Sequence, residues 1–515
     1  MASRVLPSPT GGWNVKDSIA TLSEDNATLL DNWFPDYGCV SVRPGYSEYI
    51  TSGIYNPSAS TGGADKDVET LFEYIANDKR YFGAIAAGGI WDVTDKTSLV
   101  QLRAQGTYGS NRWAHAQMEN SAGTPQLGLV CVNDEPPQLI TDGGSTMAIA
   151  AMTVSGTGLT INTLSGINVY KSRSYFWTGV DQDFWYSATN AMGGSLTRFP
   201  LGRVNNTGGD LVAMVNWSVD GGDGKDDLAV FFLSSGDVLV YSGDDPSSSW
   251  SLQGVYQMGQ LLNQQAMMRL RGDVVVATRD GYLPISANLP LDRMAPQGIS
   301  DAINPEAVER ARLGNQFKGW QIVHYPRRNM ALVNVPLSAR EFVQHVFNTG
   351  TSAAARFTNI QSFCWGLFDD QLYFGGADGK IYLFDGSRSD AGVGIIADAE
   401  TAWSYMQAPS RRKLFTAVRP TFRADGNLVG YSASLGADFS RGSAMAIPAA
   451  GVGSGTPWGS AWGSAWSTTS QTLHAGWRGV HGSGYAGSLR LRVANSTQEI
   501  DWLSTNFLYE TGGDI

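Results

Sequence analysis

The stretch DQLYFGGADGKIYLFDG, residues 370–386, contains two short runs of strand-forming residues separated by a bend. The first run is apolar, the second alternates between apolar and polar residues, and Gly and Asp stand at the bend. Aromatic and β-branched residues favour strands, whereas Gly and Asp favour tight turns. The stretch therefore predicts a β-hairpin.

The second half of this pattern recurs along the chain as a turn residue, two to four alternating strand formers and a closing Asp, Ser or Asn. The other copies are GGIWDVTD (88–95), EPPQLITDG (135–143), QDFWYSAT (182–189), GDVLVYSG (236–243), DGYLPISAN (280–288) and, more loosely, QHVFNTGT (344–351). The first five copies follow one another at intervals of about 45 to 53 residues, a spacing typical of propeller blades with four short strands each. We therefore predict an all-β fold built on a β-propeller of six or seven blades.

The composition agrees with an all-β fold. Only 16% of the residues are charged, against about 25% in typical soluble domains. The chain contains 61 Gly, 16 Trp, 20 Tyr and 20 Phe, which suit short strands and tight turns. A chain of 515 residues also has room for two or three domains or one large closed architecture.

The sequence pattern changes after about residue 405. From there on, longer predicted strands have Arg and apolar residues at alternating positions. We predict that residues 405–515 form a second, β-rich platform domain completed by residues 1–65, with the propeller at 66–404. A helical insertion is expected near 289–320, capped by Asn304, with Pro305 at the first helical position. A second short helix is expected at 23–32, after Ser23.

Charge and hydropathy exclude some classes of protein. The net charge of −11 argues against a surface that grips nucleic acid by neutralising phosphates. The uncharged stretch 143–170 is rich in Gly, Ser and Thr and alternates, so it predicts strands and no membrane span. The amino terminus, MASRVLPSPTGGW, lacks the apolar core of a secretory signal. Cys39, Cys131 and Cys364 are too far apart to suggest a disulfide framework or a zinc site.

Several motifs resemble chemical sites without meeting their requirements. GSGYAG (482–487) has dinucleotide-loop spacing, but a strand-like SLRLRV follows where a helix is required, so we interpret it as a β-turn. DGGDGKDD (220–227) lacks EF-hand spacing and is interpreted as an acidic turn. SGDDPSSSW (242–250) lacks the central Gly of a sialidase Asp-box. The five histidines have no ligand spacing, and GxSxG and HExxH do not occur. We therefore predict no catalytic residue, no cofactor, no metal site and no enzymatic activity.

The segment WGSAWGSAW places Trp458, Trp462 and Trp466 four residues apart. The intervening Gly and Ser disfavour a helix, and in an extended loop all three side chains would point to one side. Exposed Trp residues in line are typical of a partner surface or of a sugar-stacking surface. The alternative is a loop that folds back onto its own domain, and both remain open.

The stretch LLDNWFPDYGCVSVRPGY (29–46) resembles the amino-terminal signature of tail nozzle proteins of short-tailed bacteriophages, also called tail tubular protein B or packaged-DNA stabilisation proteins. Further segments agree in order, so the resemblance covers nearly the whole chain: IWDVTD (90–95), VATRDGYLPIS (276–286), ISDAINPEAVERA (299–311), NMALVNVP (329–336), DQLYFGGADGKIYLFD (370–385) and FLYETGGDI (507–515). Residues 440–470 have no counterpart in the pattern.

The resemblance implies a propeller body with a second β domain that docks on the head–tail adaptor ring. It implies a homo-hexamer around the DNA exit channel, with tail fibres or spikes as further partners. Genomic double-stranded DNA would be retained and then released through the channel without sequence readout. Such a protein would be found in the virion tail, and in the host cytoplasm during assembly. The acidic balance is compatible, because a negative wall lets DNA slide.

On this basis Trp33 and Phe34 are expected to anchor the predicted helix 23–32 against the platform, and Pro35 and Gly38 to turn the chain. Arg43 is expected to be structural, with a carboxylate on a neighbouring subunit as the alternative. The candidate subunit or partner contacts are thus Trp33, Phe34, Arg43, Trp458, Trp462 and Trp466.

Two other functions remain open. A propeller glycosidase would have a funnel lined by clustered carboxylates. A glycan-binding propeller module would use the Trp loop.

Overall fold

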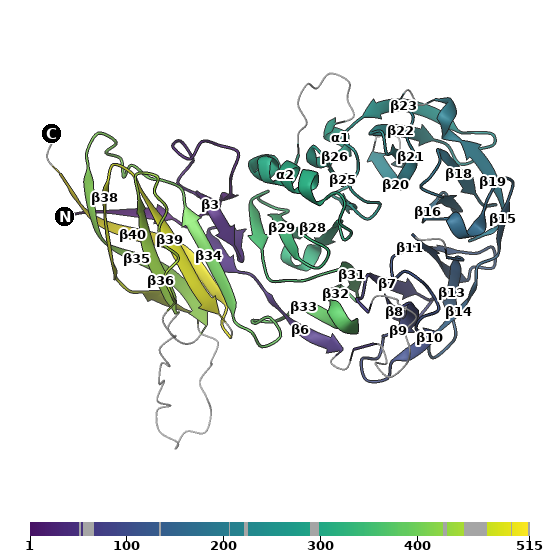
Figure 1. Ribbon diagram of the computed structural model, residues 1–515, viewed down its shortest axis with the longest axis horizontal. Coiled ribbons are helices and arrows are strands. Elements are labelled where there is room, and N and C mark those ends of the chain that lie inside the picture. Colours follow the sequence, from purple (N-terminus) through teal and green to yellow (C-terminus); the bar gives the residue numbers. More distant parts are fainter. Residues whose placement is uncertain are drawn as a thin grey trace, which may run out of the picture.

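The computed structural model describes residues 1–512 except 51–52, 55–65, 133–134, 205–206, 221–224, 289–297, 426–429, 448–470 and 496. Two bodies are visible in Figure 1, a ring of small sheets and an elongated pair of sheets. The first is the propeller and the second is the platform. Strands from both ends of the sequence build the platform.

Six separate sheets form the blades of a six-bladed β-propeller. All are antiparallel meanders of three or four strands, one with an added parallel strand. Their strands are β7 (Thr70–Ile75), β8 (Arg80–Ala86), β9 (Gly89–Asp92) and β10 (Val100–Arg103); β11 (Trp113–Glu119), β12 (Pro125–Cys131), β13 (Gln138–Asp142) and β14 (Met147–Ala151); β16 (Gly166–Tyr170), β17 (Arg173–Trp177), β18 (Asp183–Tyr186) and β19 (Gly194–Pro200) with β15 (Val154–Gly156); β20 (Leu211–Asp220), β21 (Lys225–Leu233), β22 (Asp237–Ser242) and β23 (Ser251–Gln257); β24 (Met267–Leu270), β25 (Asp273–Thr278) and β26 (Gly281–Pro284); β31 (Cys364–Phe368), β32 (Gln371–Gly375) and β33 (Ile381–Ser387) with β6 (Gly45–Ile50).

A further meander closes the ring between β24 and β31, both of which contact its first strand. It consists of β27 (Gln321–Tyr325), β28 (Met330–Pro336), β29 (Phe342–Asn348) and β30 (Ala354–Phe357). Unlike the six blades, it belongs to a nine-stranded sheet that continues into the platform. The ring and the platform therefore share one sheet.

The repeat found in the sequence marks the same position in every meander. Each copy supplies the third strand, namely β9, β13, β18, β22, β26 and β33, and the loose copy supplies β29. The strands β9, β18 and β29 are buried at every position. A strand enclosed by its neighbours tolerates few charges. This explains why the third strand has the most regular sequence pattern in each meander.

The platform is a sandwich of two sheets. Sheet A contains β1 (Ala2–Pro7), β4 (Trp33–Asp36), β5 (Cys39–Val42), β35 (Lys413–Asp425), β37 (Gln471–Ala475), β38 (Arg478–Gly484) and β40 (Ile500–Thr511). Sheet B contains β2 (Gly12–Trp13), β3 (Asn26–Asp31), β34 (Ile395–Thr401), β36 (Tyr431–Ala437) and β39 (Gly487–Asn495), followed by β30 to β27. Alternate residues of the long strands, such as Phe422, Leu491 and Trp502, fill the core.

The predicted helix at 23–32 is wrong, because residues 26–31 form the strand β3. This strand pairs antiparallel with β34 and parallel with β2, and its Ala27 and Leu30 side chains are fully buried. Pairing partners distant in the sequence thus override the local helix signal.

The helical insertion is confirmed as α2 (Asn304–Gly314), with Pro305 in its first turn and the short α1 (Ile285–Asn288) before it. Asn304 does not cap the helix. Ile303 occupies the cap position without a side-chain hydrogen bond, and Asn304 Oδ1 accepts a hydrogen bond from Ser300 Oγ at 3.1 Å.

Three smaller expectations are settled by the strands. The stretch 143–170 forms β14, β15 and β16, and no helix in the described part of the chain is long and apolar enough to cross a membrane. The GSGYAG motif turns between β38 and β39, with a strand where a dinucleotide loop needs a helix. The strand pairings also move two segments across the expected domain boundaries: β6 joins the propeller and β34 joins the platform.

Candidate functional site: the joint between propeller and platform

The stretch 31–50 connects the two bodies. It leaves β3 in sheet B, forms the β4–β5 hairpin in sheet A, and continues into β6, which completes a propeller blade by pairing with β33. The hairpin turns at Tyr37 and Gly38, whose φ of 72° lies in the left-handed region that Gly adopts readily. This stretch of twenty residues therefore contributes to sheet B, to sheet A and to one propeller blade.

Trp33 and Phe34 anchor opposite bodies. Trp33 is fully buried, with its ring centroid 5.8 Å from that of Trp502 in the platform. Phe34 is also buried and lies 6.5 Å from Phe357, in a cluster with Trp365 and other propeller residues. Successive side chains of a strand point to opposite faces, so β4 serves both cores. These residues lie inside their own chain and cannot be surface contacts with a partner, contrary to that expectation.

Asn32 is a hub of hydrogen bonds. Its φ of 60° places it in the left-handed region, which Asn tolerates better than most residues. Its Oδ1 accepts from Arg43 Nε and from the Thr358 amide, both at 2.8 Å. Its Nδ2 donates to Thr358 Oγ1 at 2.9 Å and to the Ile396 carbonyl at 2.8 Å. The side chain thereby fills its full capacity of two donors and two accepting lone pairs.

Arg43 is wholly enclosed in the same cluster. Its side chain is 0% exposed and forms a bidentate pair with Asp390, with Nη1–Oδ1 at 2.8 Å and Nη2–Oδ2 at 2.6 Å. The other donors reach Asn32, the Pro44 carbonyl and the Thr358 carbonyl. All five guanidinium donors are used, so Arg43 has a structural role and none is left for a carboxylate on a neighbouring subunit. We call Asn32, Arg43, Thr358 and Asp390 the joint.

A second bidentate pair lies beside the joint. Arg356 Nε and Nη2 contact the Asp31 carboxylate at 2.7 and 2.8 Å, at the place where β30 and β3 meet in parallel. The guanidinium carbon of Arg356 also lies 5.2 Å from the ring centroid of Trp13. Since β3 and β30 share one residue pair in register, these side chains supplement a short backbone connection between the bodies.

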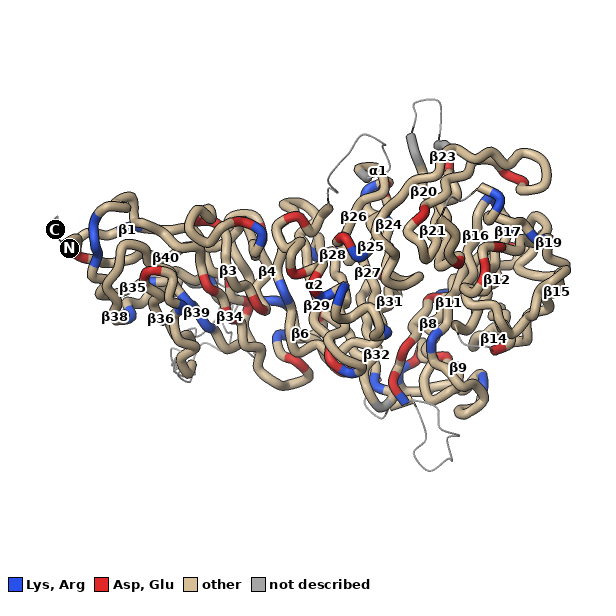
Figure 2. Tube along the Cα trace, turned by 45° about the horizontal axis from the view of Figure 1, so that its top comes forward, with Lys and Arg blue, Asp and Glu red and all other residues tan. Residues whose placement is uncertain are grey.

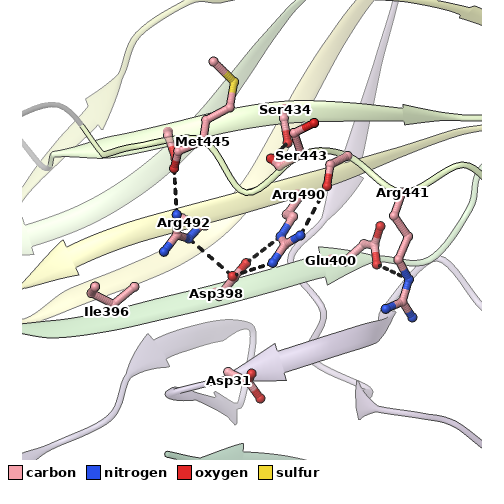
Figure 3. A network of polar contacts seen from close by, with 12 residues as sticks. Asp31, Ile396, Asp398, Glu400, Ser434, Arg441, Ser443, Met445, Arg490 and Arg492 are labelled. Atoms are coloured by element: carbon pink, nitrogen blue, oxygen red, sulfur yellow. Dashed lines mark hydrogen bonds and ion pairs between the residues drawn. The ribbon is translucent and has the colours of Figure 1, made fainter. Parts of the chain in front are cut away.

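The outer face of sheet B carries a group of charges that Figure 3 shows from close by. Asp398 accepts from Arg490 Nη2 at 2.9 Å and pairs with Arg492 Nε at 3.3 Å. Glu400 is almost fully buried and pairs with Arg441 Nε at 3.2 Å. Burial raises the pKa of Glu400 above its ordinary value. We call Asp398, Glu400, Arg441, Arg490 and Arg492 the charge ladder.

The segment 441–445 lies over this ladder. Arg492 Nη1 donates to the Met445 carbonyl at 2.7 Å, Arg490 Nη1 to the Gly442 carbonyl at 3.3 Å, and Ser434 Oγ to the Ser443 carbonyl at 2.7 Å (Figure 3). Trp458, Trp462 and Trp466 stand further along the chain, outside the described residues. Whether these tryptophans face a partner therefore stays a prediction.

The side of sheet A that faces away from the core is rich in exposed apolar groups. We define the platform face as Val5, Leu414, Arg419, Leu473 and Trp477. Leu473 and Trp477 are 69% and 47% exposed, and the Arg419 guanidinium carbon lies 5.1 Å from the Trp477 ring centroid. More than half of the exposed large apolar side chains among the described residues belong to the platform, the smaller body. A surface of this kind is typical of an interface.

Sequence reasoning missed Asn32, Thr358 and Asp390. Asn32 stands inside the quoted DNWFP motif, and Asn before a strand is a signal for a left-handed residue. Nothing in the sequence points to Asp390 as the partner of Arg43, because 347 positions separate them.

No protein-family model and no curated protein matches this sequence. Among solved structures, the chain is similar to a crystal structure of BBS1N in complex with ARL6DN, soaked with lead. The sequence identity is 12%, the match covers 50% of this chain and 77% of that chain, and the TM-score is 0.30. A likeness at this level gives no guidance on function. The conclusion that stands is that the protein is a six-bladed β-propeller with a separate platform of N- and C-terminal strands.

Proposed function

We propose that this chain is a subunit of the tail nozzle of a short-tailed bacteriophage. Six copies would form a ring that continues the DNA exit channel, retains the packaged genome and opens for ejection. The observation that carries the proposal is the joint. The residues on which the resemblance to tail nozzle proteins begins, 29–46, are those that fasten the platform to the propeller.

A rigid connection suits a nozzle. A ring that holds back compressed DNA is loaded along its axis, so a docking domain and a channel body must not move apart under force. Here one sheet runs through both bodies, and a buried bidentate pair and a filled hydrogen-bond hub secure the crossing. A flexible linker would instead allow the domains to separate.

The platform face supports ring formation with a second copy of this chain as its occupant. Ring contacts are heterologous, so each subunit offers one surface to the next copy and a different surface to the previous one. The platform face combines exposed Leu and Val with a Trp–Arg pair, and Trp and Arg are frequent hot-spot residues in interfaces. The remaining partners of the proposal are the adaptor ring, fibres or spikes, and double-stranded DNA.

The charge distribution is compatible with DNA that passes without being gripped. Figure 2 shows acidic and basic residues interspersed on both bodies. With a net charge of −11, a gripping surface would need a concentrated basic stripe.

No observation favours the glycosidase alternative. Among the described residues that line three cavities of the propeller, Glu69 is the one carboxylate, and Arg112 contacts its Oε1 at 2.8 Å. A glycosidase would instead place two carboxyl groups on either side of the scissile bond. The absence of enzymatic activity stays a prediction.

Electron microscopy of the purified chain, alone and mixed with tailless DNA-filled particles of its source phage, tests the proposal. We expect sixfold density below the portal and adaptor, with DNA retained. The variant Leu473→Asp, which places a charge in the platform face, should fail to form the ring. Val180→Asp is the matched control, since Val180 is a similarly exposed propeller residue at 72%. Monomers that ignore the particles would reject the nozzle function.

A further inference from the structure

Two adjoining cavities lie at one mouth of the propeller axis. Their volumes are about 370 and 320 Å³, and they share lining residues that include Arg112, Gln316 and Phe317. The lining segments 109–112, 262–265 and 315–318 each stand just before the first strand of a meander, β11, β24 and β27. Because the first strands surround the axis of a propeller, segments that precede them meet at the same end of that axis.

Uncharged amide side chains dominate this mouth. Asn263, Gln264, Gln265, Asn315 and Gln316 all line it. Within the described part of the chain, the side-chain amides of Gln264, Gln265, Asn315 and Gln316 make no hydrogen bond. Each amide therefore offers two donors and an accepting oxygen to a ligand. Neighbouring hydroxyls of a sugar need this combination of donor and acceptor.

Phe317 adds an apolar surface among the amides. Its ring is half-buried, and its amide nitrogen donates to the Gly314 carbonyl at 3.0 Å, which fixes the loop after α2. An aromatic ring beside polar groups suits a ligand with one apolar side and a polar rim. A pyranose ring has this character.

The charges at the mouth argue against a polyanion as its ligand. Arg112 Nε and Nη2 both contact Glu69 Oε1, at 3.0 and 2.8 Å, and both side chains are largely buried, so this pair is neutral as a unit. Among the described residues of the lining, Lys318 is then the remaining cation. DNA or a polyphosphate would need several free cations to be held.

The polar lining continues along the axis. A third cavity of about 140 Å³ shares Gln264 and Gln265 with the mouth and adds Asn168 and His115. Desolvation by the surrounding protein lowers the pKa of His115, so this ring is neutral at pH 7. The deeper cavity therefore adds no charge to the lining, although the Asn168 amide already donates to the Met214 carbonyl and to Asn216 Oδ1, both at 3.1 Å.

We propose that the propeller mouth binds a neutral oligosaccharide, with the amides of residues 264, 265 and 316 on its hydroxyls and Phe317 stacked on a sugar ring. Each mouth cavity lies within the range of about 300–1,000 Å³ that small-molecule sites occupy. This site is independent of the platform face and of ring formation. In a tail protein it would give the nozzle its own contact with a glycan surface.

Saturation-transfer NMR and titration calorimetry with the purified full chain test the site. The probes are an array of neutral oligosaccharides that includes maltotriose, cellotriose and tri-N-acetylchitotriose, with trigalacturonate as the acidic comparison. We expect at least one neutral probe to bind at millimolar concentration or below, with the ring protons of one sugar receiving most of the transferred magnetisation. Since monomers suffice, failure here leaves the ring experiment unaffected, and the reverse also holds.

Substitutions decide whether binding occurs at the mouth. Gln264→Ala, Gln316→Ala and Phe317→Ala should each weaken binding at least tenfold, whereas Phe317→Tyr should retain it. Gln101→Ala is the matched control, because Gln101 is an exposed amide on the outer strand β10. Thermal unfolding shows whether a variant is folded. The proposal is overturned if no neutral probe binds, if all three variants bind as the wild type does, or if trigalacturonate alone binds and Lys318→Ala abolishes its binding.

Discussion

The joint and the charge ladder both contain arginine–carboxylate pairs, yet the two sets of pairs are built differently. At the joint, Arg43 and Asp390 are 0% and 8% exposed and the arginine has every donor satisfied. On the ladder, Asp398 is shared between two partly exposed arginines, which also hold the backbone of the segment 441–445. Removing one partner of the joint pair leaves a buried charge without compensation, whereas Asp398 keeps one arginine when the other is removed. The same chemistry is therefore structural in one place and adjustable in the other.

The largest effect is expected at the joint. Asp390→Ala would leave the Arg43 guanidinium buried without its carboxylate, which costs about 3–5 kcal/mol of unfolding free energy. Urea denaturation measures this loss. The matched control is Glu309→Ala, which removes an exposed, solvent-screened pair with Arg312 and should leave the unfolding free energy nearly unchanged. Equal losses in the two variants would remove the distinction between buried and hydrated pairs.

Two substitutions of Asn32 distinguish the cost of backbone strain from the cost of lost hydrogen bonds at the joint. Asn32→Ala loses all four side-chain hydrogen bonds and keeps a Cβ at a φ of 60°, so we expect a loss of roughly 2–4 kcal/mol. Asn32→Gly loses the same hydrogen bonds without the strain and should be about 1 kcal/mol more stable than Asn32→Ala. Thermal unfolding of both variants checks this order. If Gly is no better than Ala, the left-handed conformation contributes nothing.

Removing an arginine from the charge ladder should affect the segment next to it more than the stability of the whole protein. Arg492→Ala is expected to change the unfolding free energy by about 1 kcal/mol or less, because Asp398 keeps Arg490 as its closer partner at 2.9 Å. It should nevertheless increase hydrogen exchange in residues 441–445, since the contact with the Met445 carbonyl is lost. Hydrogen exchange with mass spectrometry detects this. Unchanged exchange would show that Arg492 does not hold the segment.

The smallest expected effect is the pH dependence of stability that arises from Glu400. Burial raises the pKa of Glu400, so the folded state binds its proton more tightly than the unfolded state. The ionised carboxylate therefore costs stability, and this cost appears as pH rises from the ordinary Glu pKa through the folded one. We expect the stability of Glu400→Gln relative to the wild type to increase over that window. Denaturation curves from pH 4 to pH 7 measure it, and a flat difference would contradict the shift.

The sequence was informative where a pattern is local and uninformative where partners are distant. Each blade repeats within about 50 residues, so the hairpin of 370–386 and its relatives predicted the propeller. The strand β3 appeared as a helix because its partner β34 lies at 395–401. Trp33 and Phe34 were expected to anchor a helix against the platform, whereas they lie on the strand β4 and serve opposite bodies. The mouth combines loops at 109–112, 262–265 and 315–318, whose convergence no single stretch can reveal.

The pairing of β6 with β33, and of β1, β3 and β5 with β40 and β34, has a consequence for synthesis. Residues 2–50 leave the ribosome long before the strands that they join, so the last blade cannot form until residues 381–387 are made and the platform cannot form until residues 500–511 are made. Such distant contacts also make folding slow. Under the proposed function, an incomplete chain has no platform face to offer, and a truncated product cannot enter a growing ring.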